Sequence, residues 1–520
     1  MYLPASKPTL ISISVMVLCN MVQAQPDIAW QRALGGMYED HVEDLAATLD
    51  GGYIAVGYAY SNDGDVSGQQ GEGDGWVVKL DGNGDLVWQQ CLGGSLADKL
   101  FTVLALPDGG CLAAGVTNSD DGDVSGAHGL NDAWVVRLDP AGTLLWQRCL
   151  GGSGNDAANS LVPAAGGGYF LTGVTDSPDG DVIGLHGVVG DGWVVKLDDQ
   201  GDIESQRCLG GTGSVIGHDV LPRADGGVIV ALASNSVDGD VTAPLGDMDA
   251  WLVKLDSVGS IEWDVSAGGM FMDLMYPSLA GTADGGFAML GQSLSVYGFP
   301  GTCTLASNRD VYLVRFDASG TQLWHRCYGG PWNDAGADLL AMADGGFTLA
   351  GTVELDGCDV GSVNGVLDLW LVRVDASGIL LWERACGGSL GDVATSLVMS
   401  PDGNLAMGGY TLSSDGDVTG QHGDADGWVV RFGLDDVGIG PTEGPSVQFW
   451  QAAGAPQLHV FLPDPGAFTW WVSDARGAVV AQGTVRSGSV VLDLKGLNAG
   501  AYWITFQEGG RRTTRSFFLQ

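Results

Sequence analysis

A motif of aspartate, a small or apolar residue and an aromatic residue recurs seven times and constrains this chain more than any other feature. Successive copies are 58, 59, 58, 61, 58 and 58 residues apart, and their aromatic residues are Trp76, Trp134, Trp193, Trp251, Tyr312, Trp370 and Trp428. A fixed period of this length indicates one supersecondary unit copied along the chain. Because each unit of such an array packs mainly against its neighbours, 520 residues need not mean several domains.

The second copy shows the structure of one unit. Strand-like runs at 98–106 and 111–116 are separated by an Asp-Gly-Gly turn, and further runs follow at 133–138 and 144–150. Turn-forming residues stand at every junction and helical periodicity is absent. Four short strands repeated seven times predict an all-β fold, a seven-bladed β-propeller.

The two ends of the repeat array are complementary. The last unit stops after three strands at Phe432, and residues 28–36 carry the missing fourth-strand pattern, Trp-Gln-Arg followed by Gly-Gly. We therefore expect the N-terminal strand to complete the last blade and close the ring, which removes exposed strand edges. The propeller is assigned to residues 25–432.

The repeat resembles the secreted bacterial β-propeller repeat family, often called SBBP. The matching residues of the first copy are an Asp-Gly-Gly turn before 53–58, the segment 74–81, and the segments 86–88 and 92–95. The resemblance covers residues 28–432. It implies a propeller fold and a secreted protein, and because the family shares no catalytic residues it implies no chemistry.

The first 24 residues have the pattern of a secretory signal peptide. Lys7 gives a positive start, 10–17 is apolar, and Val22-Gln23-Ala24 forms a small-residue cleavage site. The apolar run is too short to cross a bilayer. We expect a cleaved signal and no transmembrane segment.

The C-terminal part differs from the repeats in composition. Residues 433–445 are rich in Gly, Pro and Asp and predict a linker. Residues 446–520 predict a separate small β-sandwich, with strands at 458–461, 469–473, 479–485, 490–494, 502–506 and 514–519.

This tail resembles the C-terminal sorting domain of type IX secretion cargo in the Bacteroidetes. The resemblance rests on 472–477, on 492–502 and on the basic segment 511–515; the usual opening proline-asparagine-proline element is absent. It implies the type IX secretion machinery as a partner. It also implies export through the periplasm, to a location that is secreted or on the outer cell surface.

Charge is concentrated in the repeats. Residues 25–445 contain 15 Lys and Arg against 59 Asp and Glu, a net charge of −44, whereas 446–520 contain 6 against 4, a net charge of +2. So acidic a body argues against nucleic acid or an anionic membrane as partner. It is compatible with cation binding and equally with solubility outside the cell.

The cysteines suggest buried thiols and one candidate disulfide. Cys91, Cys149, Cys208 and Cys327 occupy one repeat position, too far apart for disulfides, and are expected to be small buried hydrophobes. Cys303 and Cys358 lie in the same loop of consecutive units and are the one pair considered for a disulfide.

The loop between the second and third strands carries an Asp-Gly-Asp motif in five units. Paired carboxylates, with the aspartate of the aromatic motif following nearby, are candidate oxygen ligands for Ca²⁺. The alternative is structural, because Asp-Gly forms turns and Asp side chains bond to nearby backbone. The candidate calcium ligands are Asp63, Asp65, Asp74, Asp121, Asp123, Asp132, Asp179, Asp181, Asp191, Asp238, Asp240, Asp249, Asp415, Asp417 and Asp426.

A second acidic ring begins the first strand of each unit except the fourth, which has Val215. Propeller topology opens these loops and the Asp-Gly-Asp loops on one face, so the ring marks a candidate ligand face. Alternatively, each aspartate only starts its strand by hydrogen bonding. The candidate ligand-face residues are Asp40, Asp98, Asp156, Asp273, Asp334 and Asp392, with Trp332, which departs from the repeat.

The sequence favours a non-enzymatic function. We find no nucleophile–base motif and no phosphate-binding loop, and the carboxylates are too regularly repeated to single out a catalytic pair. His128, His186 and His422 recur in one loop of different units and are interpreted as loop structure. The prediction is a binding propeller for an unknown extracellular glycan or protein, with calcium as a candidate stabilising ion. The alternative is an extracellular hydrolase or lyase.

Overall fold

The computed structural model describes residues 25–244, 248–268, 273–293 and 309–433, and in the C-terminal part 448–451, 457–474, 479–493, 500–508 and 511–519. The chain divides into two units, Met1–Asp435 and Asp436–Gln520. The signal peptide and nearly all of the linker expected from the sequence lie outside the described residues.

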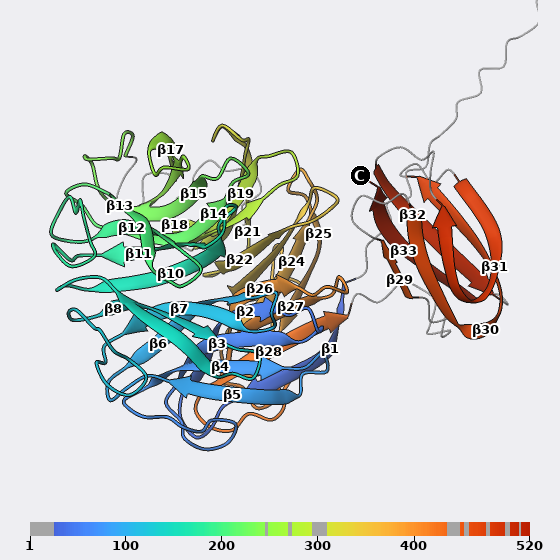
Figure 1. Cartoon of the computed structure of the whole chain (residues 1–520), viewed down its shortest axis with the longest axis horizontal. Helices are drawn as coiled ribbons and strands as arrows, with labels where there is room; N and C mark the ends of the chain where they lie inside the picture. The colour runs from blue at the N-terminus through green and yellow to red at the C-terminus, as the bar shows by residue number, and fades with distance from the viewer. Residues whose placement is uncertain are drawn as a thin grey trace, which may run out of the picture. The chain divides into compact units, whose positions relative to one another are not determined.

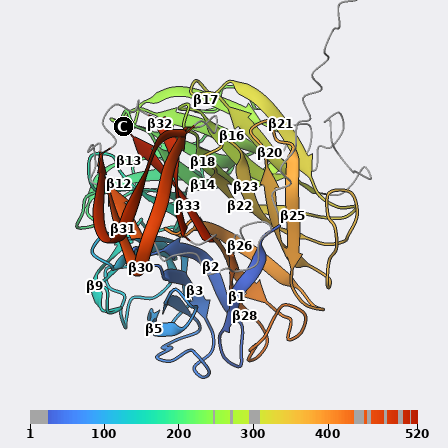
Figure 2. The same cartoon turned by 90° about the vertical axis from the view of Figure 1, so that its right-hand side faces the viewer.

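The first unit is a ring of seven four-stranded antiparallel sheets, as predicted (Figures 1 and 2). In six blades the strands follow one another in the chain. The first three blades contain β2–β5 (Asp40–Ala47, Tyr53–Ala59, Asp74–Leu80, Leu86–Leu92), β6–β9 (Asp98–Ala105, Cys111–Thr117, Asp132–Leu138, Leu144–Leu150) and β10–β13 (Asp156–Pro163, Tyr169–Thr175, Asp191–Leu197, Ile203–Leu209). The next three contain β14–β17 (Val215–Pro222, Val228–Ser234, Asp249–Leu255, Ile261–Ala267), β18–β21 (Asp273–Gly281, Phe287–Ser293, Asp310–Phe316, Gln322–Tyr328) and β22–β25 (Ala335–Ala341, Phe347–Val353, Asp368–Val374, Leu380–Cys386).

The seventh blade joins the two ends of the propeller. It contains β26 (Asp392–Met399), β27 (Leu405–Thr411), β28 (Asp426–Gly433) and, as its fourth strand, β1 (Asp27–Leu34). Strand β1 pairs antiparallel with β28 from Asp27 opposite Gly433 to Leu34 opposite Gly427. The predicted closure by the N-terminal strand is confirmed.

The third strand of each blade is buried on both sides. In β4, with the sequence Asp-Gly-Trp-Val-Val-Lys-Leu, every residue is buried, because this strand lies inside its own sheet and both faces pack on neighbouring blades. A continuous apolar run is the pattern expected of such a strand. The aromatic-motif tryptophans are buried at 0–1% exposure, so they are core residues.

The first strands of the blades surround the axis of the ring, each in contact with the next. Each described first strand has a bulge, and the residue after it is Asp44, Thr102, Ser160, Asp219, Ser278, Asp338 or Ser396. Asp44 accepts hydrogen bonds from the Val103 backbone N–H of the next blade at 2.8 Å and from Ser396 of the preceding blade at 2.9 Å. These side chains satisfy backbone groups at the inner strand edges, which have no further strand to pair with.

At the end of the blades that carries the turn between third and fourth strands, a fourth-strand tryptophan packs beneath the turn of the next blade. A methyl group on Gly84 would lie 2.7 Å from Trp30, and one on Gly142 would lie 2.8 Å from Trp88. The indole N–H of Trp30 also donates to the Gly82 carbonyl at 3.1 Å. The repeated fourth-strand tryptophans therefore pack between blades.

The second unit is an antiparallel sheet of five strands: β29 (Gln448–Gln451), β30 (Gln457–Asp474), β31 (Val479–Asp493), β32 (Gly500–Glu508) and β33 (Arg511–Leu519). Four of the strands predicted here form two long ones, since β30 and β31 each span two predicted segments. Their pairing is interrupted between Leu462 and Ala467. Before this break β30 pairs with β29 and after it with β32, so all five strands belong to one hydrogen-bonded sheet instead of two separate ones.

Two further observations concern covalent state and membrane association. Cys91, Cys149, Cys208 and Cys327 are buried thiols, as predicted. Cys358 is disulfide-bonded, and Cys303, its candidate partner, lies outside the described residues. Among the described residues there is no helix long and apolar enough to span a bilayer.

Candidate functional site

The first aspartate of each Asp-Gly-Asp motif holds the loop that enters the same blade. Asp63 Oδ1 accepts a hydrogen bond from the Met37 backbone N–H at 2.8 Å. The equivalent carboxylates accept the corresponding backbone N–H at 2.7 Å in four further blades, in the pairs Asp121–Ser95, Asp179–Ser153, Asp238–Thr212 and Asp415–Ser389. The backbone N–H of the second aspartate bonds the same loop, as Asp65 does to the Gly35 carbonyl at 2.8 Å. The main contacts of these loops are therefore hydrogen bonds between Asp side chains and backbone groups, the alternative to calcium binding.

The first-strand ring lies beneath the face instead of on it. Asp40 Oδ2 accepts from the Gly36 N–H at 2.8 Å, and its Oδ1 accepts from the Tyr60 and Ser61 N–H groups at 3.0 and 3.1 Å. Asp98, Asp156, Asp334 and Asp392 bond the matching glycine in the same way. All five are 0–1% exposed, which corrects the prediction that these carboxylates form the surface of a ligand face. The side chain of Asp273 lies outside the described residues.

The aspartate of the aromatic motif has one bonded and one unbonded oxygen. Asp74 Oδ2 accepts from the Gln70 N–H at 2.8 Å, while its Oδ1 is buried without a hydrogen-bond partner. The same Oδ1 atom lacks a partner in Asp132, Asp191, Asp310, Asp368 and Asp426. Burial raises the pKa of Asp74 and Asp368 to about 6 and that of Asp310, which is also near Asp334, to about 7.

Carboxylates meet across the boundary between blades. Asp74 lies near Asp98 and Asp123 of the next blade, and both raise its pKa. Asp65, by contrast, lies beside His422 of the preceding blade. The predicted grouping of Asp63, Asp65 and Asp74 as ligands from one unit is therefore wrong, because strand pairing directs these side chains to opposite boundaries. In the part of the chain that the structure describes, no three His, Cys, Asp or Glu side chains are placed to hold one metal ion.

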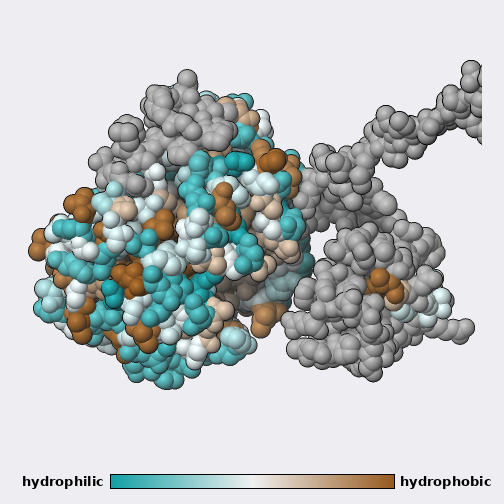
Figure 3. Space-filling view, turned by 90° about the horizontal axis from the view of Figure 1, so that it is seen from above, coloured by the Kyte–Doolittle hydropathy of each residue, from teal (hydrophilic) through white to brown (hydrophobic). Residues whose placement is uncertain are grey.

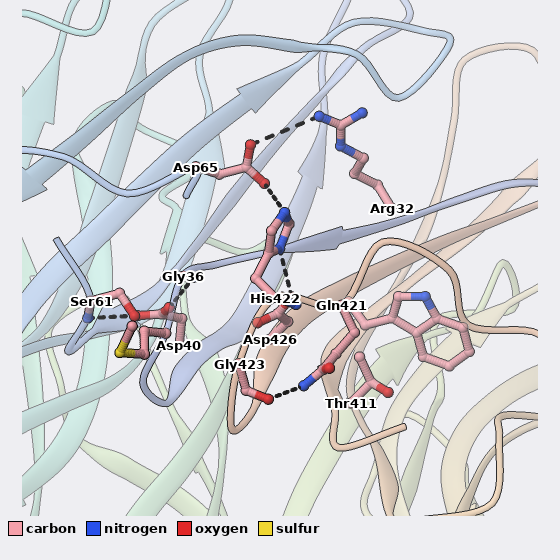
Figure 4. A network of polar contacts seen from close by, with 12 residues as sticks. Arg32, Gly36, Asp40, Ser61, Asp65, Thr411, Gln421, His422, Gly423 and Asp426 are labelled. Atoms are coloured by element: carbon pink, nitrogen blue, oxygen red, sulfur yellow. Dashed lines mark hydrogen bonds and ion pairs between the residues drawn. The ribbon is translucent and has the colours of Figure 1, made fainter. Parts of the chain in front are cut away.

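The recurring histidines link neighbouring blades. Figure 4 shows His422 between Asp426 and Asp65: Nδ1 lies 2.8 Å from Asp426 Oδ2 and Nε2 lies 4.0 Å from Asp65 Oδ2. Arg32 of β1 approaches the other Asp65 oxygen at 3.9 Å. His186 makes the same link between Asp191 and Asp240, at 2.7 and 3.5 Å. The interpretation of these histidines as loop structure extends to joining the blades.

A second cluster, on the inner strands, departs from the repeat. His41 stacks on Tyr410 of the seventh blade with ring centroids 4.0 Å apart and on Tyr58 at 4.8 Å. The Tyr58 hydroxyl lies 2.9 Å from His41 Nδ1, and Lys99 Nζ of the second blade lies 3.9 Å above the Tyr58 ring. Glu43 Oε1 lies 3.9 Å from His41 Nδ1. We call these five residues the axial cluster.

The axial cluster belongs to three adjacent blades. The paired positions of His41–Tyr58 and Val393–Tyr410 correspond to Ala157–Val174 and Ile216–Ala233 in the third and fourth blades. The stacked imidazole and phenol rings therefore distinguish the first and seventh blades from the third and fourth, at the end of the blades that carries the Asp-Gly-Asp loops. The fourth blade has His218 where the first has Glu43.

Burial governs the protonation of the cluster. Burial and the nearby Lys99 ammonium lower the pKa of His41 to about 4. Burial raises the pKa of the Glu43 carboxyl and of the Tyr58 and Tyr410 hydroxyls. At neutral pH the stack is therefore an uncharged imidazole between two phenols, with an ammonium on one side. Such a set places aromatic rings, phenol hydroxyl groups and an ammonium group within one cluster, and groups of these kinds also recognise sugars and polar side chains.

The repeat pattern does not predict the axial cluster, because its residues are those that depart from the repeat. His41, Tyr58 and Tyr410 become visible only when the units are superposed and positions that break the pattern are sought. Trp332 was found in that way, and it is 50% exposed. The space-filling view shows hydrophobic residues scattered among hydrophilic ones on the visible face of the propeller (Figure 3).

Comparisons with known proteins give limited similarity. No family model matches the chain. Regulatory protein FlaEY of Caulobacter vibrioides is 30% identical over 138 residues, which is 25% of this chain and 14% of that protein. The chain thus matches only a small part of the length of this relative.

Solved structures resemble the chain at the level of fold. The Pan2 WD40 domain of Neurospora crassa has a TM-score of 0.42 at 11% identity, covering 77% of this chain and 95% of the domain. Sqt1 of Chaetomium thermophilum has a TM-score of 0.41 at 14% identity, covering 78% and 99%. A fungal alcohol oxidase in complex with copper has a TM-score of 0.45 at 12% identity, covering 95% and 99%.

Proposed function

We propose that this chain is a secreted or surface-attached propeller that binds an extracellular glycan or protein without transforming it. The observation that carries the proposal is the axial cluster, where three adjacent blades replace small or aliphatic residues with His41, Tyr58, Tyr410 and Lys99. The stack of His41 with the two tyrosines sets this part of the inner strands apart from the equivalent pairs of the third and fourth blades. Such a difference between blades is better explained by a binding site for one ligand than by a structural contact that every blade would need.

A glycan and protein array with the purified propeller tests the proposal. The His41→Ala and Tyr410→Ala variants should lose at least tenfold in affinity for the captured ligand. Ile216→Ala is the matched control, because it removes a side chain at the same inner-strand position in the fourth blade, away from the cluster. Equal losses in all three variants, with the folded state intact, would place the ligand elsewhere.

The alternative function is an extracellular hydrolase or lyase. Most of the strongly shifted aspartates recur from blade to blade, among them Asp74, Asp310 and Asp368. A catalytic pair needs two carboxyl groups that differ from each other and from their repeats. Binding is therefore the preferred function, and turnover of the captured ligand by the wild-type propeller would reverse the choice.

We also propose export by the type IX secretion machinery, with the segment 446–520 as the sorting signal and 1–24 as the signal peptide. The support is the sequence resemblance of the tail and its charge of +2 beside an acidic body. A chain truncated after Pro445 should accumulate in the periplasm of a type IX host. Release of the truncated chain at the normal rate would remove this part of the proposal.

Calcium is proposed as a stabilising ion on weaker grounds. Its support is the unbonded buried Oδ1 atom repeated at the blade boundaries and the carboxylates of the next blade beside it. Ca²⁺ takes six to eight oxygen ligands, so backbone carbonyls and water would have to complete any such site. Calorimetric titration with calcium tests this. If calcium binding releases or absorbs no heat and a chelator does not shift the melting temperature, the calcium proposal is refuted.

A further inference from the structure

The boundary between the third and fourth blades lacks the tryptophan that fills the other described boundaries of this kind. The fourth strand β13 has Ser205 where the fourth strands of the other six blades have tryptophan: Trp30, Trp88, Trp146, Trp263, Trp324 and Trp382. For the first five of these, the ring lies directly beneath a turn glycine of the next blade: Gly84, Gly142, Gly201, Gly320 and Gly378. A methyl group built on the equivalent Gly259 meets no atom within 4 Å.

The missing ring leaves a cavity of about 160 Å³. Its apolar wall is formed by Phe170, Val194, Val228 and Leu255, and the turn at Gly259 covers one side. Neighbouring aromatic residues narrow the equivalent space elsewhere: Trp263 stacks on Phe287, and Trp324 meets Phe347 edge to face. At the boundary between the third and fourth blades, the residue at the position of Phe287 and Phe347 is Val228. Its side chain is smaller and does not fill the space that the missing tryptophan ring leaves.

Arg207 borders the cavity without filling it. Its Nη1 donates to the Gly259 carbonyl at 3.2 Å and its Nη2 lies 3.4 Å from Asp240. Its Nε is buried without a hydrogen-bond partner. Lys196, also in the lining, is ion-paired with Glu204 at 2.6 Å. Because both cations already have a carboxylate, the cavity does not select for an anion, while the guanidinium still offers a cation to a ring face.

We infer that this cavity is a binding site for a planar, uncharged aromatic ring of about the size of indole. The observation behind the inference is that the same space, between the same elements, holds an indole ring in five other boundaries. The volume is also sufficient, because an enclosed cavity of about 150 Å³ accepts benzene. Unlike that cavity, this one is open to solvent and has polar residues in its wall, among them Gln206 and Arg207. Pockets for drug-sized ligands have roughly 300–1,000 Å³. The site therefore takes one ring system, either a small aromatic molecule or an aromatic side chain of another polypeptide.

This site is separate from the proposed function. The cavity lies at the end of the blades that carries the turns between third and fourth strands, and the axial cluster lies at the opposite end. Exposed Val258, at 79% exposure, stands in the turn beside the cavity and leaves its edge open to solvent. Failure of one site would leave the other unaffected.

Indole is the probe for the test. Calorimetric titration and fluorine NMR with 5-fluoroindole should show saturable binding of one molecule per chain, with a rise in the midpoint of thermal unfolding. The Ser205→Trp variant supplies the missing ring from the chain itself, so it should weaken indole binding at least tenfold and unfold at a higher temperature. Ser205→Thr keeps the cavity and should bind as the wild type does.

A second variant makes the test independent of Ser205→Trp. Trp88→Ser creates the same vacancy at the boundary between the first and second blades, so the number of bound indole molecules should rise to two. N-acetyl-tryptophanamide distinguishes the sources: binding as tight as that of indole indicates a protein side chain as the natural occupant, and tenfold weaker binding indicates a free small molecule. No saturable binding of indole to the wild type, or binding that Ser205→Trp leaves unchanged, overturns the inference.

Discussion

The two ends of the blade boundaries are held together by different chemistry. At the Asp-Gly-Asp end, buried carboxylates such as Asp40 and Asp392 bond loop N–H groups, and His422 or Gln70 reaches the next blade. At the other end, an indole ring lies beneath a glycine, as Trp88 does beneath Gly142. The contacts at the polar end depend on the protonation of the carboxyl groups and on the direction of their hydrogen bonds. The contacts at the aromatic end depend on the volume of the ring. The two ends should therefore respond to different perturbations.

The largest loss of thermal stability is expected when strand β1, which contributes to both ends of a blade boundary, is deleted. Strand β1 supplies Trp30 to the aromatic end and Arg32 to the polar end, and it completes the seventh blade. Deleting residues 25–36 should lower the midpoint of thermal unfolding by about 10 °C or more, since one kcal/mol corresponds to roughly 2–4 °C in a domain of 150–250 residues.

Differential scanning calorimetry measures this change. A synthetic peptide of residues 25–36, added in excess, should restore part of the midpoint by re-forming the pairing with β28. An unchanged midpoint after the deletion would show that the pairing does not stabilise the ring.

The second prediction isolates the aromatic end. Trp88→Ser should cost about 2–3 kcal/mol, less than the roughly 3–5 kcal/mol lost with a fully buried aromatic side chain, because Trp88 is only partly buried. The loss should be the same at pH 5 and pH 8, because no titrating group takes part in this packing. Chemical unfolding at both pH values measures it, and a loss that changes by more than about 1 kcal/mol between them would contradict the separation of the two ends.

The third prediction isolates the polar end through pH. Burial raises the pKa of Asp74, Asp334 and Asp368 to about 6 and that of Asp310 to about 7. The folded chain therefore binds more protons than the unfolded chain between about pH 4 and pH 7, so its stability falls as pH rises through this window. His41 and His218 oppose this trend, because the pKa of each is lowered to about 4. Burial also raises the pKa of Asp219 to about 6 and that of Asp338 to about 7, so the raised carboxyl groups outnumber the two imidazoles and the midpoint should rise from pH 8 to pH 5.

A substitution at one boundary distinguishes the pH dependence that comes from the buried carboxyl groups from the pH dependence that comes from the overall negative charge of the chain. Asp368→Asn removes one raised carboxylate, and the new amide can donate toward Asp392, so at pH 8 it should stabilise by about 2 kcal/mol. At pH 5 the stabilisation should be about half of that at pH 8, and it should vanish only near pH 4, where the unfolded carboxyl group is protonated as well. Asp392→Asn is the matched opposite, because Asp392 accepts hydrogen bonds from Gly388, Thr411 and Ser413. It should destabilise at both pH values; stabilisation by Asp392→Asn would refute this view of the polar end.

The sequence was sufficient for what repeats along the chain. The period of the aromatic motif predicts seven blades, and the stray strand at Trp30 predicts the closure, because both depend on local patterns in the same order as the structure. Asp65 and Asp74 were grouped wrongly, because neighbours in sequence face different boundaries and the partners of each come from another blade. In the tail, two separate strands were predicted at 458–461 and 469–473, where β30 continues with a break in pairing. The sequence pattern does not single out Ser205, because the consequence of this residue is the absence of the tryptophan ring that other fourth strands have.

The smallest effect is expected for His422→Gln. In the first blade Gln70 stands at the same loop position, and its Nε2 donates to Asp123 of the next blade at 2.6 Å. Its backbone N–H bonds Asp74 at 2.8 Å, just as that of His422 bonds Asp426 at 2.8 Å. Because a glutamine makes the same link, the variant should unfold within about 0.5 kcal/mol of the wild type, the range usual for surface substitutions. His422→Ala keeps the backbone bond but loses the 2.8 Å hydrogen bond between Nδ1 and Asp426 and the 4.0 Å ionic contact with Asp65 of the next blade, so it should cost about 1 kcal/mol, the net value of one hydrogen bond. Equal stability of the two variants would mean that the side-chain link between blades contributes nothing, and the polar end would then depend on its buried carboxylates alone.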